Sequence, residues 1–413
     1  MTEEMSLLRG FFNPAARIPL KEWTGRPEGT GVYFKDFVLR DPADLSGLII
    51  EPEPGVALLP FNPERTIAGL VREEYAQGGS GILSRVPFRA RWIPGRIKEH
   101  LLRPLLGARL ARTGVFPRWP IEPCVEDIRA LVADAAKRAG TFPEPAPFWP
   151  EGKRYAAMLS HDMDSGKACR KGYWKAFAEM EEAHGLRSSW HFCTEHFRDA
   201  TAVMEELSRR GHEIAWHGHR HDPSVLRSSG NSFSESIRAN RDFFKEYGVR
   251  GFRSPNFIRT PGLYRALKGI LGYDSSARDT AAEIFSSRTR EGCCTVFPFM
   301  RNGVLEIPVT VPDDISVRCV TQDDEESIFN VQLQKIEWIR SRGGVAVTLT
   351  HPESWISLRK PLFNAYRRLV EFVSRDRCAW NVLGRDIEAW WRKRAGGCSA
   401  DSFNGEKPHR NRK

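Results

Sequence analysis

Residues 155–164 read YAAMLSHDMD, a short apolar run that ends in two carboxylates. The run Tyr155–Ser160 is typical of a buried strand, because it is short and apolar. Side chains two apart in an extended segment point the same way, so Asp162 and Asp164 can face one cavity. Two carboxylates at a buried strand end are costly unless a metal or another cation pairs with them. They therefore indicate a metal site, with a pair of turn or helix-capping aspartates as the alternative.

Strand-like and helix-like segments alternate from about residue 153 onward. Strands are expected over 188–193, 213–216, 304–309, 345–350 and 379–383, and helices over 171–184, 202–210, 235–247, 261–271, 327–342, 361–374 and 385–394. This alternation predicts a parallel sheet with crossover helices. So many units in one domain indicate a β/α barrel, complete or distorted, whose chemistry lies where strands end and loops begin.

Histidines follow two of these predicted strands. The segment WHGHRH, residues 216–221, places His217 and His221 four residues apart, and imidazole is a ligand for zinc, iron, cobalt and nickel. His219 lies between them as an alternative ligand or as a group that orients one. His351 directly follows the strand expected over 345–350. Each signal alone has a plainer interpretation, a surface histidine run for residues 217–221 and a core or turn histidine for His351.

One arginine completes the set. Arg253 follows Gly251 and Phe252, and a guanidinium beside a carboxylate keeps that carboxylate ionised and fixes its orientation. Taken alone, Arg253 could be a surface residue beside a turn. Because these clusters all lie at predicted strand ends, they indicate one hydrolytic site with metal ligands, a base and an acid.

These motifs resemble the polysaccharide deacetylase family (NodB-homology, carbohydrate esterase family 4-like) over about residues 150–395. The matching segments are 160–166, 211–217 with His221, 253–255, 272–276, 305–308, 349–352, 379–383 and 387–391. The resemblance implies a distorted (β/α)7 barrel and a hydrolase of carbon–nitrogen bonds other than peptide bonds. It also implies a substrate, the N-acetyl group of a sugar or polysaccharide, plausibly a surface-glycan precursor.

The resemblance also implies a role for each site residue. The metal, expected to be Zn²⁺, would be held by Asp164, His217 and His221. The base would be Asp162, oriented by Arg253, and the acid would be His351, tuned by Asp274. The backbone N–H of Asn256 would hold the oxyanion. Two positions depart from the family pattern. Met163 separates acids that are usually adjacent, and Asn256 stands where an aromatic residue is common.

Two other functions stay open at this point. One is hydrolysis of a linear or cyclic amide that is not a sugar derivative. The other is a catalytically silent glycan-binding protein, against which the complete set of acid, base and ligands argues.

The preceding residues, 1–150, predict an N-terminal extension or small α+β domain before the barrel of 151–395. Strands are expected over 31–34, 47–51 and 56–59, a helix over 125–137 and an extended proline-rich linker over 141–150. The segment 84–119 carries nine basic residues and one acid, so it could lie on an anionic membrane, bind a phosphate-bearing substrate or pack as a helix on the barrel. The tail 396–413 is expected to be disordered.

Composition narrows the class of partner. The 413 residues include 62 Lys and Arg against 52 Asp and Glu, a net charge of +10 that favours acidic partners. No recognition helix or Cys/His zinc module is evident, so nucleic acid is not expected. No signal peptide or membrane-spanning run is recognised, and the eight cysteines form no C-x-x-C pair. These features predict a cytoplasmic, at most membrane-peripheral, enzyme.

Overall fold

The structure is a computed structural model that describes residues 49–54, 56–59, 61–76, 116–140, 148–222, 231–281 and 291–396. Its centre is a nine-stranded sheet. Eight of the strands follow the order β10-β3-β4-β5-β6-β7-β9-β8, and the ninth, β11, pairs with β3. The strands are β3 (Tyr155–Met163), β4 (Ser188–Phe192), β5 (Glu213–Trp216), β6 (Gly251–Phe252), β7 (Tyr273–Asp274), β8 (Phe299–Arg301), β9 (Val304–Glu306), β10 (Val345–Thr350) and β11 (Ala379–Asn381). Neighbouring strands are parallel except for β8 and β9. The predicted α/β class and distorted barrel are confirmed.

The distortion lies where the sheet returns to β10. The segment after β9 is bonded on one side to residues beyond β7, since the Val309 N–H donates to the Ala277 carbonyl over 2.8 Å. On its other side, the Val311 N–H donates to the carbonyl of Val347 in β10 over 3.0 Å. Between them, the Thr310 hydroxyl donates to the Val345 carbonyl and accepts from the Val347 N–H. A side chain thus replaces part of the strand ladder, so this segment is not regular strand.

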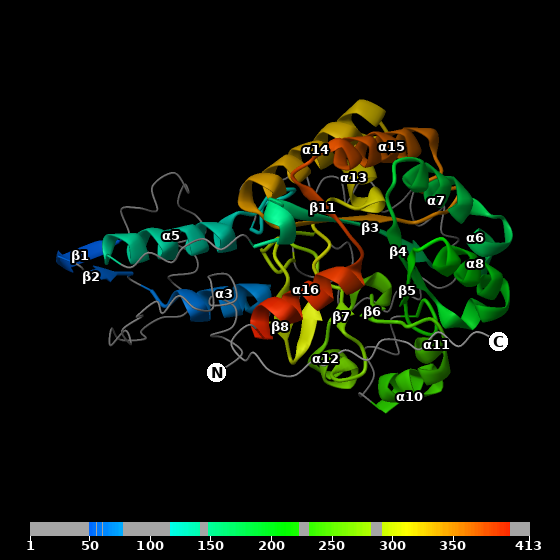
Figure 1. Ribbon diagram of the computed structural model, residues 1–413, viewed down its shortest axis with the longest axis horizontal. Helices are drawn as coiled ribbons and strands as arrows, with labels where there is room; N and C mark the ends of the chain where they lie inside the picture. Colours follow the sequence, from blue (N-terminus) through cyan, green and yellow to red (C-terminus); the bar gives the residue numbers. More distant parts are fainter. Residues whose placement is uncertain are drawn as a thin grey trace, which may run out of the picture.

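Helices cover the outside of the sheet (Figure 1), with α14 and α15 on one flank and α6, α7 and α8 on another. Their bounds are α6 (Gly166–Arg170), α7 (Tyr173–Ala183), α8 (Phe197–Arg209), α10 (Asn231–Ala239), α11 (Arg241–Glu246), α12 (Pro261–Leu267), α13 (Asp314–Thr321), α14 (Glu325–Arg342), α15 (Lys360–Arg375) and α16 (Gly384–Gly396). Helix α14 shows why the boundaries were predictable. Asp324 accepts from the Ser327 N–H at its start, and Gly343 ends it with a φ of 82°.

The sequence analysis is wrong about one helix and misses another. The single helix expected over 235–247 is two helices, α10 and α11, separated at Asn240. The Asn240 amide donates to the Ser236 carbonyl over 2.7 Å, so a side chain takes an acceptor of the helical ladder. Helix α13 was not predicted at all, because its eight residues follow Pro312 without a clear apolar period. It begins at Asp313, which accepts from the Ser316 N–H.

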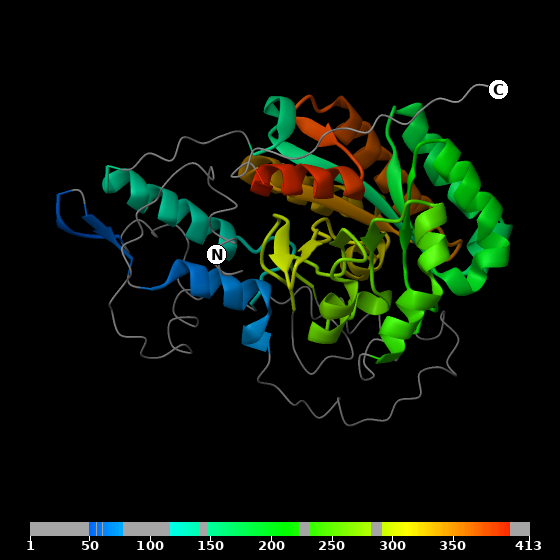
Figure 2. The same cartoon turned by 60° about the horizontal axis from the view of Figure 1, so that its bottom comes forward.

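The described N-terminal residues form a hairpin of β1 (Ile50–Glu53) and β2 (Val56–Leu58) and the helices α3 (Pro63–Val71) and α5 (Cys124–Arg138). In two views these elements lie to one side of the barrel (Figures 1 and 2). Their apolar side chains share one buried cluster with Ala277, Cys293, Cys294 and Phe299 of the barrel. The helix expected over 125–137 and the strand over 56–59 are present, while β1 begins later than the predicted strand.

Several predictions concern residues outside the described ranges. These are the strand over 31–34, most of the linker over 141–150, the tail from 397 and the basic segment 84–119 except for residues 116–119. No finding supports an anionic membrane or a phosphate as a partner of that segment. In the described part of the chain, no helix has the length and apolar character needed to cross a bilayer. The cytoplasmic location stays a prediction.

Candidate active site

The predicted site residues come together at one edge of the barrel. Asp162 lies in β3, and His217, Arg253 and His351 each directly follow a strand, β5, β6 and β10 respectively. Because the strands are parallel, their carboxyl ends meet at the same edge. Asp164 follows β3 there. These residues, far apart in the sequence, therefore surround one small volume.

Asp164, His217 and His221 form a group that could hold a metal. One ligand atom from each residue lies within 4.8 Å of the others. Nε2 of His217 is 3.2 Å from Oδ1 of Asp164, and Nε2 of His221 is 3.6 Å from Oδ2 of the same carboxylate. Asp164 and Asp162 also form a second such group with His351.

His217 is oriented so that its second ring nitrogen faces Asp164. Its Nδ1 lies 2.8 Å from the Arg253 carbonyl, to which only an N–H can bond, so Nε2 of the neutral ring carries the lone pair. That lone pair faces Oδ1 of Asp164, which is buried and makes no hydrogen bond of good geometry. Two acceptors 3.2 Å apart repel each other unless a metal or a proton lies between them. The donor set and its orientation thus fit a divalent metal.

Asp162 is held as a carboxylate by Arg253. Its Oδ1 accepts from an Arg253 NH1 group over 2.8 Å, and both side chains are almost completely buried. The other Arg253 N–H groups bond to the Ser275 carbonyl and to the hydroxyls of Ser160 and Ser275, each over 3.0 Å. Burial raises the pKa of Asp162, but Arg253 and the nearby imidazoles outweigh it and lower the pKa to about 2. Asp162 is therefore an oriented, ionised carboxylate.

His351 is paired with a carboxylate that the sequence analysis missed. Its Nδ1 lies 2.8 Å from Oδ1 of Asp314, and its backbone N–H donates to Oδ2 of Asp314 over 2.7 Å. Burial lowers the pKa of His351, but the Asp314 carboxylate reverses this and raises the pKa well above its usual range. Nε2 of His351 lies 4.0 Å from Oδ2 of Asp164, so a protonated imidazole borders the same cavity.

The predicted partner of His351, Asp274, lies elsewhere, which corrects that assignment. Asp274 accepts from the Ser276 hydroxyl over 2.6 Å and lies against the carboxyl of Glu306. Burial and the charge of Glu306 raise its pKa well above the usual range. The prediction failed because Asp314 begins α13, the helix that the sequence pattern does not reveal.

Part of the barrel matches a known protein family. A family model described as polysaccharide deacetylase matches residues 152–274, which run from β3 to β7. Residues 152–274 thus match the polysaccharide deacetylase family. Members of that family are hydrolases that act on carbon–nitrogen bonds other than peptide bonds, and the match supports an enzyme of this class. A search of curated proteins finds no significant match.

Solved structures agree on the fold of this deacetylase domain. A Mycobacterium smegmatis protein assigned to the polysaccharide deacetylases has 17% sequence identity, with a TM-score of 0.50 over 63% of this chain and 96% of that one. PuuE allantoinase has 15% identity and a TM-score of 0.47, covering 60% of this chain and 94% of that one. A Pseudomonas aeruginosa PAO1 protein assigned as a polysaccharide deacetylase has 15% identity, a TM-score of 0.46 and the same two coverages.

Two histidines near the deacetylase site need an account of their own. His191, which the sequence analysis missed, is fully buried in β4 with Nδ1 3.6 Å from Oδ1 of Asp162. Burial and Arg253 lower its pKa well below the usual range, so the His191 ring beside Asp162 is neutral. All five residues of β4 are buried, so no alternation of polar and apolar positions marks His191 in the sequence.

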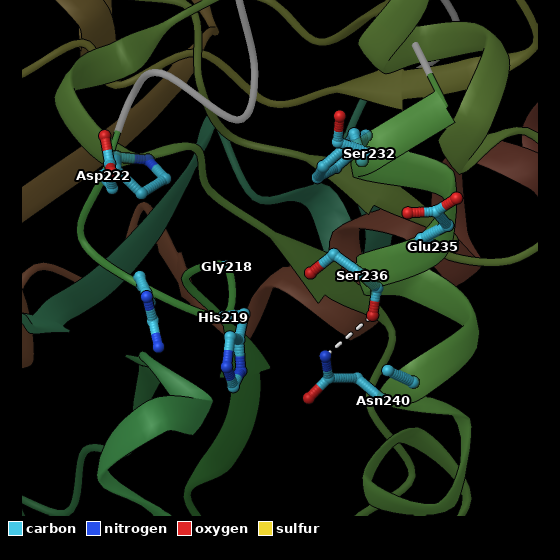
Figure 3. A pocket seen from close by; sticks show the side chains of 11 residues that line it. Gly218, His219, Asp222, Ser232, Glu235, Ser236 and Asn240 are labelled. Carbon is cyan, nitrogen blue, oxygen red and sulfur yellow. Dashed lines mark hydrogen bonds between the residues drawn. The ribbon is translucent and has the colours of Figure 1, made fainter. Parts of the chain in front are cut away.

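His219 is not in either metal group. Its Nδ1 lies 3.2 Å from the Thr194 hydroxyl, and its ring is exposed beside a cavity of about 370 Å³ (Figure 3). The opposite wall of the cavity consists of Ser232, Glu235 and Ser236 of α10 and of Asn240, which follows that helix (Figure 3). The alternative role of His219 as a ligand therefore finds no support in this arrangement.

The predicted oxyanion residue lies in a strained turn. Asn256 and Phe257 have φ angles of 54° and 55°, in the left-handed region that residues other than glycine rarely adopt. The turn Pro255–Phe257 begins two residues after Arg253, so Asn256 lies close in the chain to the end of β6.

Proposed function

We propose that this protein removes the N-acetyl group of a sugar or polysaccharide with the help of a divalent metal, expected to be Zn²⁺. The supporting observation is the buried Oδ1 of Asp164, which makes no hydrogen bond of good geometry and lies 3.2 Å from Nε2 of His217. His221 supplies the third ligand on the other oxygen of Asp164. A carboxylate and two imidazoles that leave coordination positions open are a donor set of catalytic zinc sites. When bound, such an ion polarises a carbonyl group and acidifies water.

Asp162 acts as the general base in this proposal. Its carboxylate is ionised because Arg253 and the nearby imidazoles lower its pKa to about 2, and it cannot rotate freely because three other hydrogen bonds fix Arg253. Oδ2 of Asp162 lies 3.7 Å from Nε2 of His217, so this oxygen borders the volume that the ligands enclose. It accepts the proton of the attacking water molecule.

His351 acts as the general acid. Asp314 fixes the ring through Nδ1 and keeps it protonated, which leaves the Nε2–H to point into the cavity. That proton passes to the departing amine, which would otherwise be too poor a leaving group. The backbone N–H of Asn256 is proposed to stabilise the oxyanion.

Acetate release from N-acetylated glycans, measured together with metal content, tests this function. Asp162→Asn should fold and keep its metal but lose at least about 10²–10⁴-fold in turnover, since the base is gone. His217→Ala should lose the metal, whereas the matched control His219→Ala should retain it. Near-wild-type turnover of Asp162→Asn would refute the base, and full metal occupancy of His217→Ala would refute that ligand. A wild-type protein that releases acetate from no N-acetylated sugar but cleaves another amide would refute the substrate class.

A further inference from the structure

A buried ion pair joins the N-terminal segment to the loop that follows β6. Glu73 lies just after α3, and its two carboxylate oxygens accept from Nε and NH2 of Arg259 over 2.9 and 2.6 Å. The side chains are only 12% and 6% exposed. Glu291 is farther from this guanidinium, at 3.7 Å. A two-bond pair shielded from water fixes the orientation of the guanidinium, not only its charge.

Arg259 uses its remaining nitrogen to hold the catalytic loop. NH1 donates to the Phe257 carbonyl over 2.7 Å and to the Ser276 carbonyl over 3.1 Å. It thus ties the turn after β6 to the segment after β7. The same two segments are joined once more by the Ser254 N–H, which donates to the Ser276 hydroxyl over 2.9 Å.

The turn needs such support because its backbone is strained. Asn256 and Phe257 both have positive φ angles, and neither is glycine. Strained residues of this kind persist only where the surrounding structure over-determines them. Glu73 also has a positive φ, 59°, so the segment that reaches the loop is itself held in an unfavourable conformation. Positive φ angles thus occur at Glu73 and in the turn whose carbonyl Arg259 bonds, which indicates a contact maintained for its geometry.

We propose that Glu73 is a positioning residue of the deacetylase site, acting through Arg259 on the backbone of residues 254–257. This inference rests on the proposed function, in which the Asn256 N–H stabilises the oxyanion. The N-terminal segment is then part of the catalytic unit, because it supplies a support that the barrel residues alone lack.

A second N-terminal contact provides a matched control. Asp127 of α5 pairs with Arg342 of α14 over 3.0 Å, so it too is an N-terminal carboxylate bound to a barrel arginine. That arginine lies in the last turn of α14 and makes no hydrogen bond to the described residues of the loop after β6. Loss of the Asp127 pair weakens docking of the N-terminal segment without touching the loop.

The decisive comparison is Glu73→Gln against Asp127→Asn in the full-length protein. Glu73→Gln should lower kcat about 10–100-fold with little change in KM, because the turn shifts relative to the substrate carbonyl. Its metal content should stay at the wild-type level. Asp127→Asn should keep kcat within about twofold of wild type.

Hydrogen–deuterium exchange gives a readout that does not depend on the reaction. The peptide covering 254–259 should exchange faster in Glu73→Gln and at the wild-type rate in Asp127→Asn. If Glu73→Gln does not fold, Arg259→Lys takes its place, because lysine keeps the charge but cannot bond to Glu73 and both carbonyls in the same geometry. Equal behaviour of the Glu73 or Arg259 variant and the control, or unchanged exchange in the loop, would overturn the proposal. A wild-type protein inactive on every N-acetylated sugar would instead refute the proposed function, and the exchange result alone would then decide the role of Glu73.

Discussion

The two walls of the barrel hold their functional residues by different means. In the long-strand wall, β10, β3, β4 and β5, strands pair residue by residue, with six pairs between β10 and β3 and five between β3 and β4. In the short-strand wall, β6, β7 and β9, neighbours share two pairs each, and a single pair links β5 to β6. Strand ladders position side chains in the first wall, so something else must do so in the second.

Buried polar side chains supply that support in the short-strand wall. Glu306 accepts from the Ala277 N–H over 2.7 Å and from the Tyr264 hydroxyl over 2.8 Å. Arg253 and Arg259 bond to carbonyls of the segment after β7. Substitutions in the long-strand wall should therefore lower activity and leave the fold intact. Substitutions in the short-strand wall should instead lower the stability of the fold and displace the site residues.

The largest effect is expected from Asp164→Ala in the long-strand wall. Removing this ligand should abolish metal binding and lower turnover by roughly 10³-fold or more, because the Lewis acid is lost. Thermal stability without metal should change little, since Asp164 lies just after the strand and its side chain is 25% exposed. Elemental analysis, acetate release and calorimetry measure the three quantities. A large drop in melting temperature would contradict the division between the walls.

Glu306→Ala, in the short-strand wall, should instead lower the stability of the fold. It leaves the buried Ala277 N–H and Tyr264 hydroxyl without their acceptor, which should cost about 3 kcal/mol of unfolding free energy. Tyr264→Phe removes one of these bonds and should cost about 1 kcal/mol. Denaturant unfolding measures both. A fully stable Glu306→Ala that binds no metal would reverse the expected pattern.

The same contrast explains which features the sequence predicted. The strand ends that carry Asp162, His217 and His351 were predicted because a short strand-like run precedes each of them and side-chain direction follows from the strand period. Asp314 and the Glu73–Arg259 pair were missed because each depends on a contact between distant segments, which no local pattern encodes. Asp274 was assigned to His351 for its place in a family motif, yet its neighbours in the folded chain are Ser276 and Glu306.

Asp314→Asn tests whether Asp314 or Asp274 is the partner of His351, the proposed acid. Asp314 favours the protonated form of His351, so its loss should lower the pKa of that imidazole and reduce kcat about 10–100-fold. The reduction should be greatest at high pH, where the imidazole is deprotonated first. Asp274→Asn is the control, and it should leave the pH dependence of kcat unchanged. A shifted profile in Asp274→Asn but not in Asp314→Asn would restore the partner expected from the sequence.

The smallest effect concerns Glu126 of α5, which bonds to the segment leading into β8. Its Oε1 accepts from the Thr295 hydroxyl over 2.7 Å and from the Val296 N–H over 3.2 Å. Burial raises its pKa from 4.5 to about 7, despite the charge of Arg129. The folded state therefore binds this proton more tightly than the unfolded state does, and the resulting stability is lost as pH rises from about 4.5 to 7.

Glu126→Gln should remove this pH dependence, because glutamine keeps the acceptor and cannot ionise. The difference in unfolding free energy between the variant and the wild type should grow by at most about 3 kcal/mol between pH 4.5 and 7 and then stay level. Asp279, whose pKa burial raises to about 6, contributes a slope of the same sign in both proteins, so it cancels from the difference. Denaturant unfolding at several pH values measures it. A difference that does not change with pH would mean that Glu126 is ionised in the folded protein, so that charge pairing with Arg129 outweighs burial at this contact.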